Sequence, residues 1–548
     1  MKTLSGLDAT FLYLETAETP MHVGSLHLYE LPAGFKGSFH AAVRKHLAQR
    51  VHLAPIFHQR LAFMPLDLGH PSWVNAEPVD LAFHIRKVAG GARTVREVQA
   101  EAARLHGERI DRAHPLWEFY IFDSVKAPSD GGYQGKLVAF YSKIHHAALD
   151  GKAGTLLANA ILDVTPVPRE VPLPAPTRNR RRQADLKLGE MIGAVFSNSL
   201  AQYAKLVKAL PGAASKLGSA VAHLAMPEPD GKRAPGTGPA RRVPKAPLRL
   251  APHTVFNAAI TPQRTLATAS LPFADCKRMG QAIGGSFNDI VLWLCATALR
   301  NYLIAHQSLP AKPLVAAMPV SLREAGNTEL TTQASMTLVD LATQVADPLK
   351  RMQAILASTA KVKAALVELK SVLPTDYPSL LAPWLVGGVA KAAFKTYGVS
   401  GVAEHLPLLA NVVISNVPGP QVPLYLAGAR MRTFHPMSIV MHGLALNITI
   451  QTYAGSVDFG LIADARAVPD VQTLADGLVA AFHEAEALYA RFSAPTAPPP
   501  GQTPSPRVAK ATKKRSTPSK AGAIPAKTRR KAATVPPIAT ARKKAARA

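Results

Sequence analysis

Two clusters of proline interrupt this chain of 548 residues and limit where secondary structure can be continuous. Five prolines fall within 166–176, and seven more occur from Pro227 to Pro252. Proline lacks the backbone donor and is poorly tolerated inside helices and central strands. The sequence therefore predicts a globular block over 1–164, a linker over 165–252 and a second globular block over 253–493.

Between the two proline clusters, apolar residues recur at helical spacing with lysines among them. They are Leu188, Ile192, Val195, Phe196, Tyr203, Leu206 and Leu210. Helices with this pattern are amphipathic, and they either pack against their own protein or lie in a lipid surface. The residues alone leave both interpretations open.

Both globular blocks mix strand and helix signals. Runs rich in aromatic and β-branched residues predict strands at 22–31, 116–125, 136–144, 312–323, 408–420 and 457–464. Helical composition predicts helices at 37–52, 94–109, 286–303 and 468–492, and "SGLD" at 5–8 is typical of a capped helix start. Because strands and helices alternate irregularly, we expect mixed α/β or α+β layers in each block.

The last segment, 494–548, differs from the rest of the chain in its charge. It contains 14 Lys and Arg but no Asp or Glu, and its other residues are mainly Ala, Pro, Thr and Ser. This composition cannot bury a core, so we expect a disordered tail. The tail either binds nucleic acid or anionic lipid through counterion release, or is only solvated. The preceding residues carry +13 of the net charge of +27, which suits phosphorylated ligands or an anionic membrane surface.

The cysteines and the hydropathy of the sequence predict in which cellular compartment the protein lies. Cys276 and Cys295 form no CxxC pair and no zinc spacing, which predicts reduced, buried thiols in a cytosolic protein. The first residues lack an apolar signal core, so no secretory signal is expected. Two uncharged runs, 405–429 and 433–457, are long enough to span a membrane, but their prolines, β-branched residues and polar positions predict buried strands and loops. We expect any membrane contact to be peripheral.

The segment "KIHHAALDG" at 143–151 is the most distinctive group of reactive side chains. The residues before it predict a strand, along which side chains alternate between two faces. His146 then shares a face with the even-numbered residues of 138–144, and His145 points the other way. Since adjacent strand histidines cannot both reach one atom, one is expected to react and the other to be structural. A well-placed imidazole base contributes about 10²–10⁴ in rate.

An aspartate and a glycine follow the two histidines. Asp150 either orients a histidine or anchors the loop through an arginine, and Gly151 permits a turn that a Cβ would block. The chain has no GxSxG elbow, so the base is expected to activate a substrate hydroxyl for direct transfer. Two other interpretations stay open on these residues alone. One is a buried histidine pair without chemistry, and the other is a metal site, for which no HExxH or His-rich partner is present.

Six segments together resemble a known family. "HHAALDG" fits HHxxxDG, the signature of CoA-dependent acyltransferases related to chloramphenicol acetyltransferase and to peptide-synthetase condensation domains. Other segments resemble the bacterial wax ester synthase/diacylglycerol acyltransferase family in the same order: "LSGLDATFLYLETAETPMHVGSL" (4–26), "HPLWEFYIFD" (114–123), "SFNDIVL" (286–292), "MPVSLR" (318–323) and "ISNVPGP" (414–420). The resemblance covers nearly all of 4–490, with the linker least matched and the tail outside it.

The resemblance implies a fold of two chloramphenicol-acetyltransferase-like α/β domains joined by a crossover linker, with a tunnel at their interface. Acyl-CoA would enter this tunnel from one side as a co-substrate, and a hydroxyl acceptor from the other. His146 would be the general base, while His145 and Asp150 would maintain the loop. Asp150 is expected to pair with an arginine, for which Arg323 is the best candidate. No metal or prosthetic group is implied.

Two further segments match the family's pattern. Pro115, Leu116 and Trp117 correspond to its PLW segment, for which ordinary core packing is the alternative. Asn288 and Asp289 correspond to its Asn-Asp pair, which either helps to assemble the active site or caps the following helix. The oxyanion of the reaction needs a donor, and Asn288 is a candidate.

These observations predict an O-acyltransferase that moves a long-chain acyl group from acyl-CoA to diacylglycerol or to a long-chain alcohol. We expect it in the cytoplasm, peripherally associated with the inner membrane face or with lipid inclusions. One rival is an acyltransferase of the same fold that acts on a polyketide or peptide hydroxyl or amine. A rival of another class is a non-catalytic protein that binds nucleic acid or lipid granules through its basic tail. The sequence does not indicate the oligomeric state.

Overall fold

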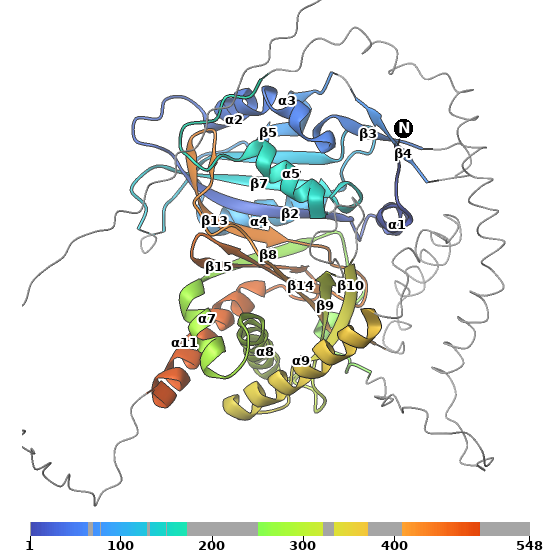
Figure 1. The fold of residues 1–548 in the computed structure, drawn as a ribbon, viewed down its shortest axis with the longest axis vertical. Coiled ribbons are helices and arrows are strands. Elements are labelled where there is room, and N and C mark those ends of the chain that lie inside the picture. The colour runs from blue at the N-terminus through green and yellow to red at the C-terminus, as the bar shows by residue number, and fades with distance from the viewer. Residues whose placement is uncertain are drawn as a thin grey trace, which may run out of the picture. The chain divides into compact units, whose positions relative to one another are not determined.

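Two six-stranded sheets form the centre of the fold (Figure 1). The computed structural model describes residues 2–63, 70–76, 78–128, 132–149, 151–172, 250–321, 334–370 and 408–493. The predicted mixed α/β fold is confirmed. The predicted linker helices, the tail, Asp150 and Arg323 lie outside the described residues.

The first sheet has the strand order β12-β13-β2-β7-β6-β5. Its strands are β2 (His22–Glu30), β5 (Ile85–Lys87), β6 (Trp117–Val125), β7 (Leu137–His145), β12 (Tyr425–Leu426) and β13 (Ala429–Met437). Strand β7 is buried along its whole length between antiparallel β2 and β6, which fits its mainly apolar and aromatic first half, 137–141. Its register with β2 pairs His145 with His22 and Leu137 with Glu30.

Strands from the second sequence block complete this first sheet. β13 runs antiparallel to β2, with Arg430 opposite Glu30 and Met437 opposite Gly24. The described residues up to Ser493 accordingly belong to one compact unit. The predicted domain boundaries at 164 and 253 stay a prediction, but membership of the first sheet crosses them.

The second sheet has the order β10-β9-β11-β14-β15-β8. Its strands are β8 (Arg264–Pro272), β9 (Val315–Ser321), β10 (Ala334–Asp340), β11 (Val412–Val417), β14 (Leu446–Tyr453) and β15 (Ser456–Asp464). In Figure 1, the helices of this half lie on the face turned away from the first sheet: α7 (Phe273–Ala282), α8 (Phe287–Ala305), α9 (Pro348–Lys370) and α11 (Val471–Ser493). Cys276 and Cys295 are free and buried on α7 and α8, as predicted.

The remaining elements cover the first sheet. The helices are α1 (Gly6–Leu14), α2 (Phe39–Ala48), α3 (Leu81–His84), α4 (Val95–His106) and α5 (Gly151–Ile161). A small sheet contains β1 (Lys2–Thr3), β3 (Gln59–Ala62) and β4 (Ser72–Asn75), and short 3-10 turns are η1 (Val51–Leu53), η2 (Pro55–Phe57), η4 (His146–Ala148) and η6 (Val255–Asn257). Helices α2 and α5 pack on one face of the first sheet, whereas α4 packs on the other, next to β8.

Local signals explain several of these elements. The predicted helix start at "SGLD" is confirmed, because Ser5 Oγ accepts from Asp8 N at 3.1 Å. The uncharged runs contain β11, β12 and β14 and overlap the two ends of β13, so within the described residues they form strands and loops. No single described helix is long and apolar enough to cross a membrane. Helices α7 and α8 together reach that length and hydropathy, but they meet at an angle of 99°.

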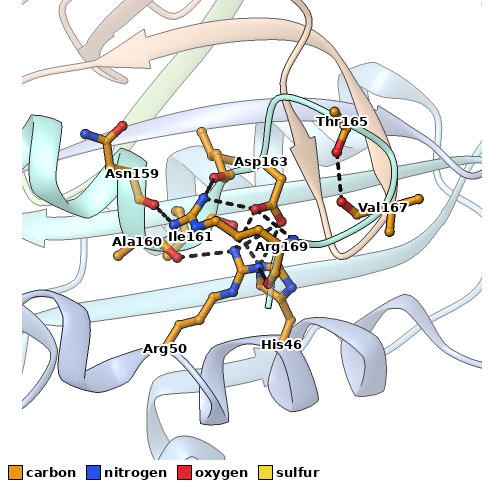
Figure 2. Close-up of polar contacts among 10 residues, drawn as sticks. His46, Arg50, Asn159, Ala160, Ile161, Asp163, Thr165, Val167 and Arg169 are labelled. Atoms are coloured by element: carbon orange, nitrogen blue, oxygen red, sulfur yellow. Dashed lines mark hydrogen bonds and ion pairs between the residues drawn. The ribbon is translucent and has the colours of Figure 1, made fainter. Parts of the chain in front are cut away.

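The chain leaves the first block through a buried ion-pair network (Figure 2). Asp163 Oδ1 accepts from Arg50 Nη1 at 3.1 Å and from Arg169 Nη1 at 3.0 Å. Arg50 also donates to the carbonyl oxygen of Arg169 at 2.8 Å. The backbone of Asp163 exchanges two hydrogen bonds with Tyr425 of β12, at 2.8 and 2.9 Å. The segment that follows α5 is therefore fixed both to Arg50, just after α2, and to a strand of the second block.

Candidate active site

The two histidines lie where β7 ends. The strand ends at His145, one residue beyond the predicted end at 144, and His146 begins the 3-10 turn η4. Backbone hydrogen bonds fix this turn: His145 N donates to Leu116 O at 3.0 Å, and His146 N donates to Met21 O at 2.8 Å. The direction of the His146 side chain thus follows from the turn rather than from strand alternation.

His145 is a fully buried residue with a defined tautomer. Its Nδ1 accepts from Ala147 N at 3.1 Å, so the proton of the neutral ring belongs on Nε2. Nε2 faces Glu15 Oε1 at 3.5 Å. Burial lowers the pKa of His145 below its ordinary value, although Glu15 acts in the opposite direction. These contacts fit a structural role in the turn.

Glu15 anchors that arrangement. Its Oε2 accepts from Arg112 Nε at 2.9 Å and from Arg112 Nη2 at 2.6 Å, two charge-assisted hydrogen bonds to one oxygen. Burial raises the pKa of Glu15, but its contacts with His145 and Arg112 outweigh burial, and the net pKa lies below the usual range. Glu15 therefore remains a carboxylate beside His145. Sequence reasoning missed both Glu15 and Arg112, since 97 residues separate them from each other and Glu15 lies 130 residues before His145.

His146 has a different environment. Its ring stacks on Phe11 of α1, with ring centroids 3.9 Å apart and planes inclined by 14°. Its Nδ1 is buried and has no hydrogen-bond partner among the residues that the structure describes. Burial lowers the pKa of His146 to about 4, and the neighbouring His145 acts in the same direction. At neutral pH the imidazole is therefore uncharged and able to accept a proton.

The Pro-Leu-Trp segment packs against the histidine turn and accepts one of its backbone hydrogen bonds. Leu116 is fully buried against Ala147 of the turn, and its carbonyl oxygen receives the His145 amide. Trp117 is also fully buried; its Nε1 donates to Phe57 O at 3.2 Å, and its ring stacks on His84. The described contacts of Leu116 and Trp117 are packing and backbone contacts, so the segment supports the site through the core.

A buried polar layer continues along β7 next to the turn. Lys143 Nζ forms an ion pair with Glu118 Oε2 at 2.8 Å and donates to two backbone carbonyls at the end of α4. On the same side, His106 Nδ1 and Tyr141 Oη are 2.8 Å apart, and His106 Nε2 lies 3.1 Å from Ser438 O. Ser438 follows β13, so this layer joins the turn's strand to the second block.

A second connection runs through the loop before β2. Met21, which accepts the His146 amide, lies in the same loop as Glu18, whose carbonyl oxygen accepts from Arg264 Nη2 at the start of β8. Burial lowers the pKa of Arg264 to about 10, while Asp464 acts in the opposite direction. The histidine turn thus lies close to the boundary between the first and second sheets.

Asn288 and Asp289 begin α8 in the second half. The N-cap is Ser286, whose N and Oγ donate to Asp289 Oδ2 at 2.7 and 2.6 Å. Asp289 therefore occupies the third position of a capping box, which corresponds to the helix-capping alternative. Asn288 Oδ1 instead accepts from Asn416 Nδ2 of β11 at 3.4 Å. No described contact joins this pair to the histidine turn, and a donor role for Asn288 stays a prediction.

The described part of the chain shows no set of side chains that could bind a metal ion. Within those residues, no group of three or more His, Cys, Asp or Glu side chains is arranged to bind a metal ion. The turn instead presents the neutral imidazole of His146 beside the buried, hydrogen-bonded His145. Such a group can accept and return a proton.

The HHxxxDG segment lies at the end of a buried strand near the boundary of two mixed sheets, and this fold and motif are those of the CoA-dependent acyltransferase class that the sequence resembles. More particularly, the chain belongs to the wax ester synthase/diacylglycerol acyltransferase family. Residues 4–291 match the family's catalytic domain, and residues 331–486 match its C-terminal domain.

Individual relatives agree with this assignment. The chain is 34% identical over 490 residues to a putative diacylglycerol O-acyltransferase of Mycobacterium tuberculosis H37Rv, which covers 88% of this chain and 99% of the relative. It is 30% identical over 480 residues to the O-acyltransferase WSD of Acinetobacter baylyi, with 86% and 94% covered. The structure of a wax ester synthase/diacylglycerol acyltransferase from Marinobacter aquaeolei VT8 matches with a TM-score of 0.60 and 28% identity, over 89% of this chain and 100% of that one.

Proposed function

We propose that this protein transfers a long-chain acyl group from acyl-CoA to the hydroxyl of diacylglycerol or of a long-chain alcohol. The observation that carries the proposal is His146, a neutral imidazole at the turn, within a chain that belongs to this family. The names of the Mycobacterium, Acinetobacter and Marinobacter relatives, which include diacylglycerol acyltransferase, O-acyltransferase and wax ester synthase, support the same chemistry.

In the proposed mechanism, His146 acts as the general base. Nε2 is the nitrogen proposed to react, because Nδ1 is the buried one. The acceptor hydroxyl gives its proton to this nitrogen while its oxygen attacks the thioester carbonyl. The tetrahedral oxyanion collapses, the C–S bond breaks, and the imidazolium returns the proton to the CoA thiolate. A base with a depressed pKa forms its imidazolium at a cost, which the charge of the neighbouring oxyanion would offset.

The other residues have positioning roles in this proposal. His145 and Glu15 would maintain the geometry of the turn through the contacts already described. Asp150 is proposed to anchor the same loop by pairing with Arg323, and Gly151 to permit the turn into α5. We also propose peripheral association with the cytoplasmic membrane face or lipid inclusions. The apolar helical pattern of the linker and the basic tail, which could contact anionic lipid or nucleic acid, support this location.

The direct test is an acyl-transfer assay with the purified full chain. Labelled palmitoyl-CoA would be given with diolein or with hexadecanol, and lipid products would be separated. We expect labelled triacylglycerol, wax ester or both, with stoichiometric release of CoA. Release of CoA without a labelled ester would show only hydrolysis, and no transfer to either acceptor would contradict the proposal.

The depressed pKa of His146 gives a pH prediction. With a pKa of about 4 instead of 6.5, the base form persists as pH falls, so kcat/KM at about pH 5.5 should remain within about twofold of its value at neutral pH. An unshifted histidine would lose about tenfold over this interval. The measurement is a pH profile of kcat/KM, and an acid limb centred near 6.5 would contradict the burial of a neutral base.

The lowered pKa of His146 also makes the stability of the protein depend on pH, so the pH profile needs a control for folding. Between about pH 6.5 and 4 the unfolded chain binds more protons at this position than the folded chain does. The contribution of His146 to stability is therefore fully present above the unfolded pKa and is lost as pH falls toward 4. Thermal unfolding at each pH would confirm that the assay reports a folded enzyme.

A further inference from the structure

A surface cavity of about 640 Å³ lies at the end of the first sheet that is opposite the histidine turn. It is lined by the loop after β2, the loop before β7, Pro166 and the β12–β13 hairpin. β2 pairs His22 with His145 at one end and Glu30 with Leu137 at the other. At about 3.3 Å per residue, the two ends are about 26 Å apart. The cavity is therefore separate from the proposed reacting atoms.

Positive charge dominates the cavity. Its lining includes Lys136, Arg430 and Arg432, against one carboxylate, Glu30. Glu30 is already occupied: Oε1 accepts from Gln134 N and Gly135 N at 2.8 and 2.6 Å, and Oε2 pairs with Arg432 Nη1 at 3.0 Å. Burial raises the pKa of Glu30, but these amide and arginine contacts outweigh it and keep the carboxyl ionised. Its charge is thus matched by Arg432, and the charges of Lys136 and Arg430 remain in excess.

Lys136 and Arg430 come from different elements and have no ion pair within 4.0 Å in the described part of the chain. Both side chains are exposed at the cavity. Two cations facing one concave space match the charge of a phosphate monoester, about −1.5 to −2 at neutral pH. A guanidinium also binds phosphate oxygens in a bidentate manner.

Backbone forms a large part of the cavity wall. Gly34 and Gly132 have φ angles of 75° and 58°, and a Cβ at either position would meet no atom within 4 Å. Those positions therefore border open space and leave peptide groups approachable, which is how backbone amides contact phosphates. The volume lies within the range of about 300–1,000 Å³ that ligand sites occupy.

The wall formed by the linker start is attached to the first sheet. Pro166 lies in an exposed turn, where Thr165 Oγ1 donates to Val167 O at 2.8 Å (Figure 2). Tyr425, on the opposite strand, is fixed to Asp163 by two backbone hydrogen bonds. The cavity is thus preformed rather than assembled by a ligand.

We propose that this cavity is a binding site for a phosphate monoester, with Lys136 and Arg430 as the residues that contact the phosphate. The ligand is either a soluble phosphate compound, such as the nucleotide part of CoA, or a phosphate headgroup in a lipid surface. Binding at this cavity is measured without turnover, so failure of this proposal and failure of the proposed acyl transfer can be told apart.

The test compares the full chain with a double variant, Lys136→Gln with Arg430→Gln. Three probes would be titrated calorimetrically or by flotation: inorganic phosphate, adenosine 3′,5′-bisphosphate, and phosphatidylcholine vesicles with or without an equal amount of phosphatidate. We expect at least about tenfold weaker binding of one or more phosphate probes by the variant, since each charge-assisted contact is worth about a decade in Kd. Unchanged thermal unfolding would show that the variant is folded.

A charge-matched control separates loss of the cavity contacts from a general loss of positive charge, because both variants keep the basic tail. Arg44 and Lys45 are exposed on α2 and do not line the cavity, so Arg44→Gln with Lys45→Gln loses the same charge elsewhere. Weakening limited to the bisphosphate would identify a soluble ligand, and weakening limited to phosphatidate vesicles would identify a lipid headgroup. Equal weakening in both double variants, or no weakening in the cavity variant, would overturn the proposal, as would absence of saturable binding to any phosphate probe.

Discussion

Replacing His146 with alanine is expected to reduce kcat/KM for acyl transfer by about 10²–10⁴, the usual contribution of a general base. The substitution removes the only proposed proton acceptor while leaving the backbone bond from residue 146 to Met21 available. The loss should fall on kcat, because the base acts in the transition state rather than in binding of acyl-CoA. Steady-state kinetics with palmitoyl-CoA and the preferred acceptor would measure it.

A second histidine provides the matched control for this experiment. His483 is exposed on α11, and its described ionic contact is with Glu486 on the same helix. We expect His483→Ala to retain activity within about twofold, since exposed residues away from a site usually have small effects. If His146→Ala retained most of its activity while remaining folded, the assignment of the base would be wrong.

Replacing Asp163 with alanine is expected to lower the free energy of unfolding by about 3–5 kcal/mol. Asp163 is the carboxylate of the buried network, and the side chain of its partner Arg50 is only 2% exposed. Removing the carboxylate leaves the Arg50 charge buried without its counter-ion, which is why the penalty exceeds that of an exposed pair. Urea-induced unfolding of the full chain would measure the change.

Two further variants test whether the loss of stability in Asp163→Ala comes from the unpaired charge of Arg50. Asp111 pairs with His114 at the surface, with 54% of its side chain exposed, so Asp111→Ala should cost less than about 0.5 kcal/mol. Replacing both Arg50 and Asp163, as Met and Leu, should cost less than Asp163→Ala alone, because no buried charge then lacks a partner. Similar losses for Asp111→Ala and Asp163→Ala would contradict the network's role.

Local patterns predicted most of the fold. The strand at 136–144 and the helix starting near Ser286 depend on neighbours in sequence, and both are confirmed within one residue. The pairing of β13 with β2 was not predictable in this way, because the two strands are about 400 residues apart in the sequence. The alternation of apolar and polar residues predicts a strand but does not indicate which strand it pairs with. A family resemblance indicated a crossover but not this register.

The candidate site shows the same limit. The motif at 143–151 identified His145 and His146 as reactive candidates, and strand alternation predicted different surroundings for them. Their surroundings do differ, but the reason is that His146 lies in the turn η4 and not on the strand. The partners that produce this difference, Glu15 and Phe11, come from α1 and the loop after it, over 130 residues away. The sequence predicted the start of that helix but not these contacts, since no spacing rule links a carboxylate at 15 to an imidazole at 145.

The position of β13 also has a consequence for synthesis of the protein. The edge of β2 that β13 covers is made early, and the strand that covers it follows about 400 residues later. At about 5–20 residues per second, that edge waits for about 20–80 seconds on the ribosome. An unpaired edge is a template for wrong pairing with other chains. Nascent chains of this protein should therefore depend on chaperones that shield strand edges, and slowing translation between 31 and 428 should increase aggregation.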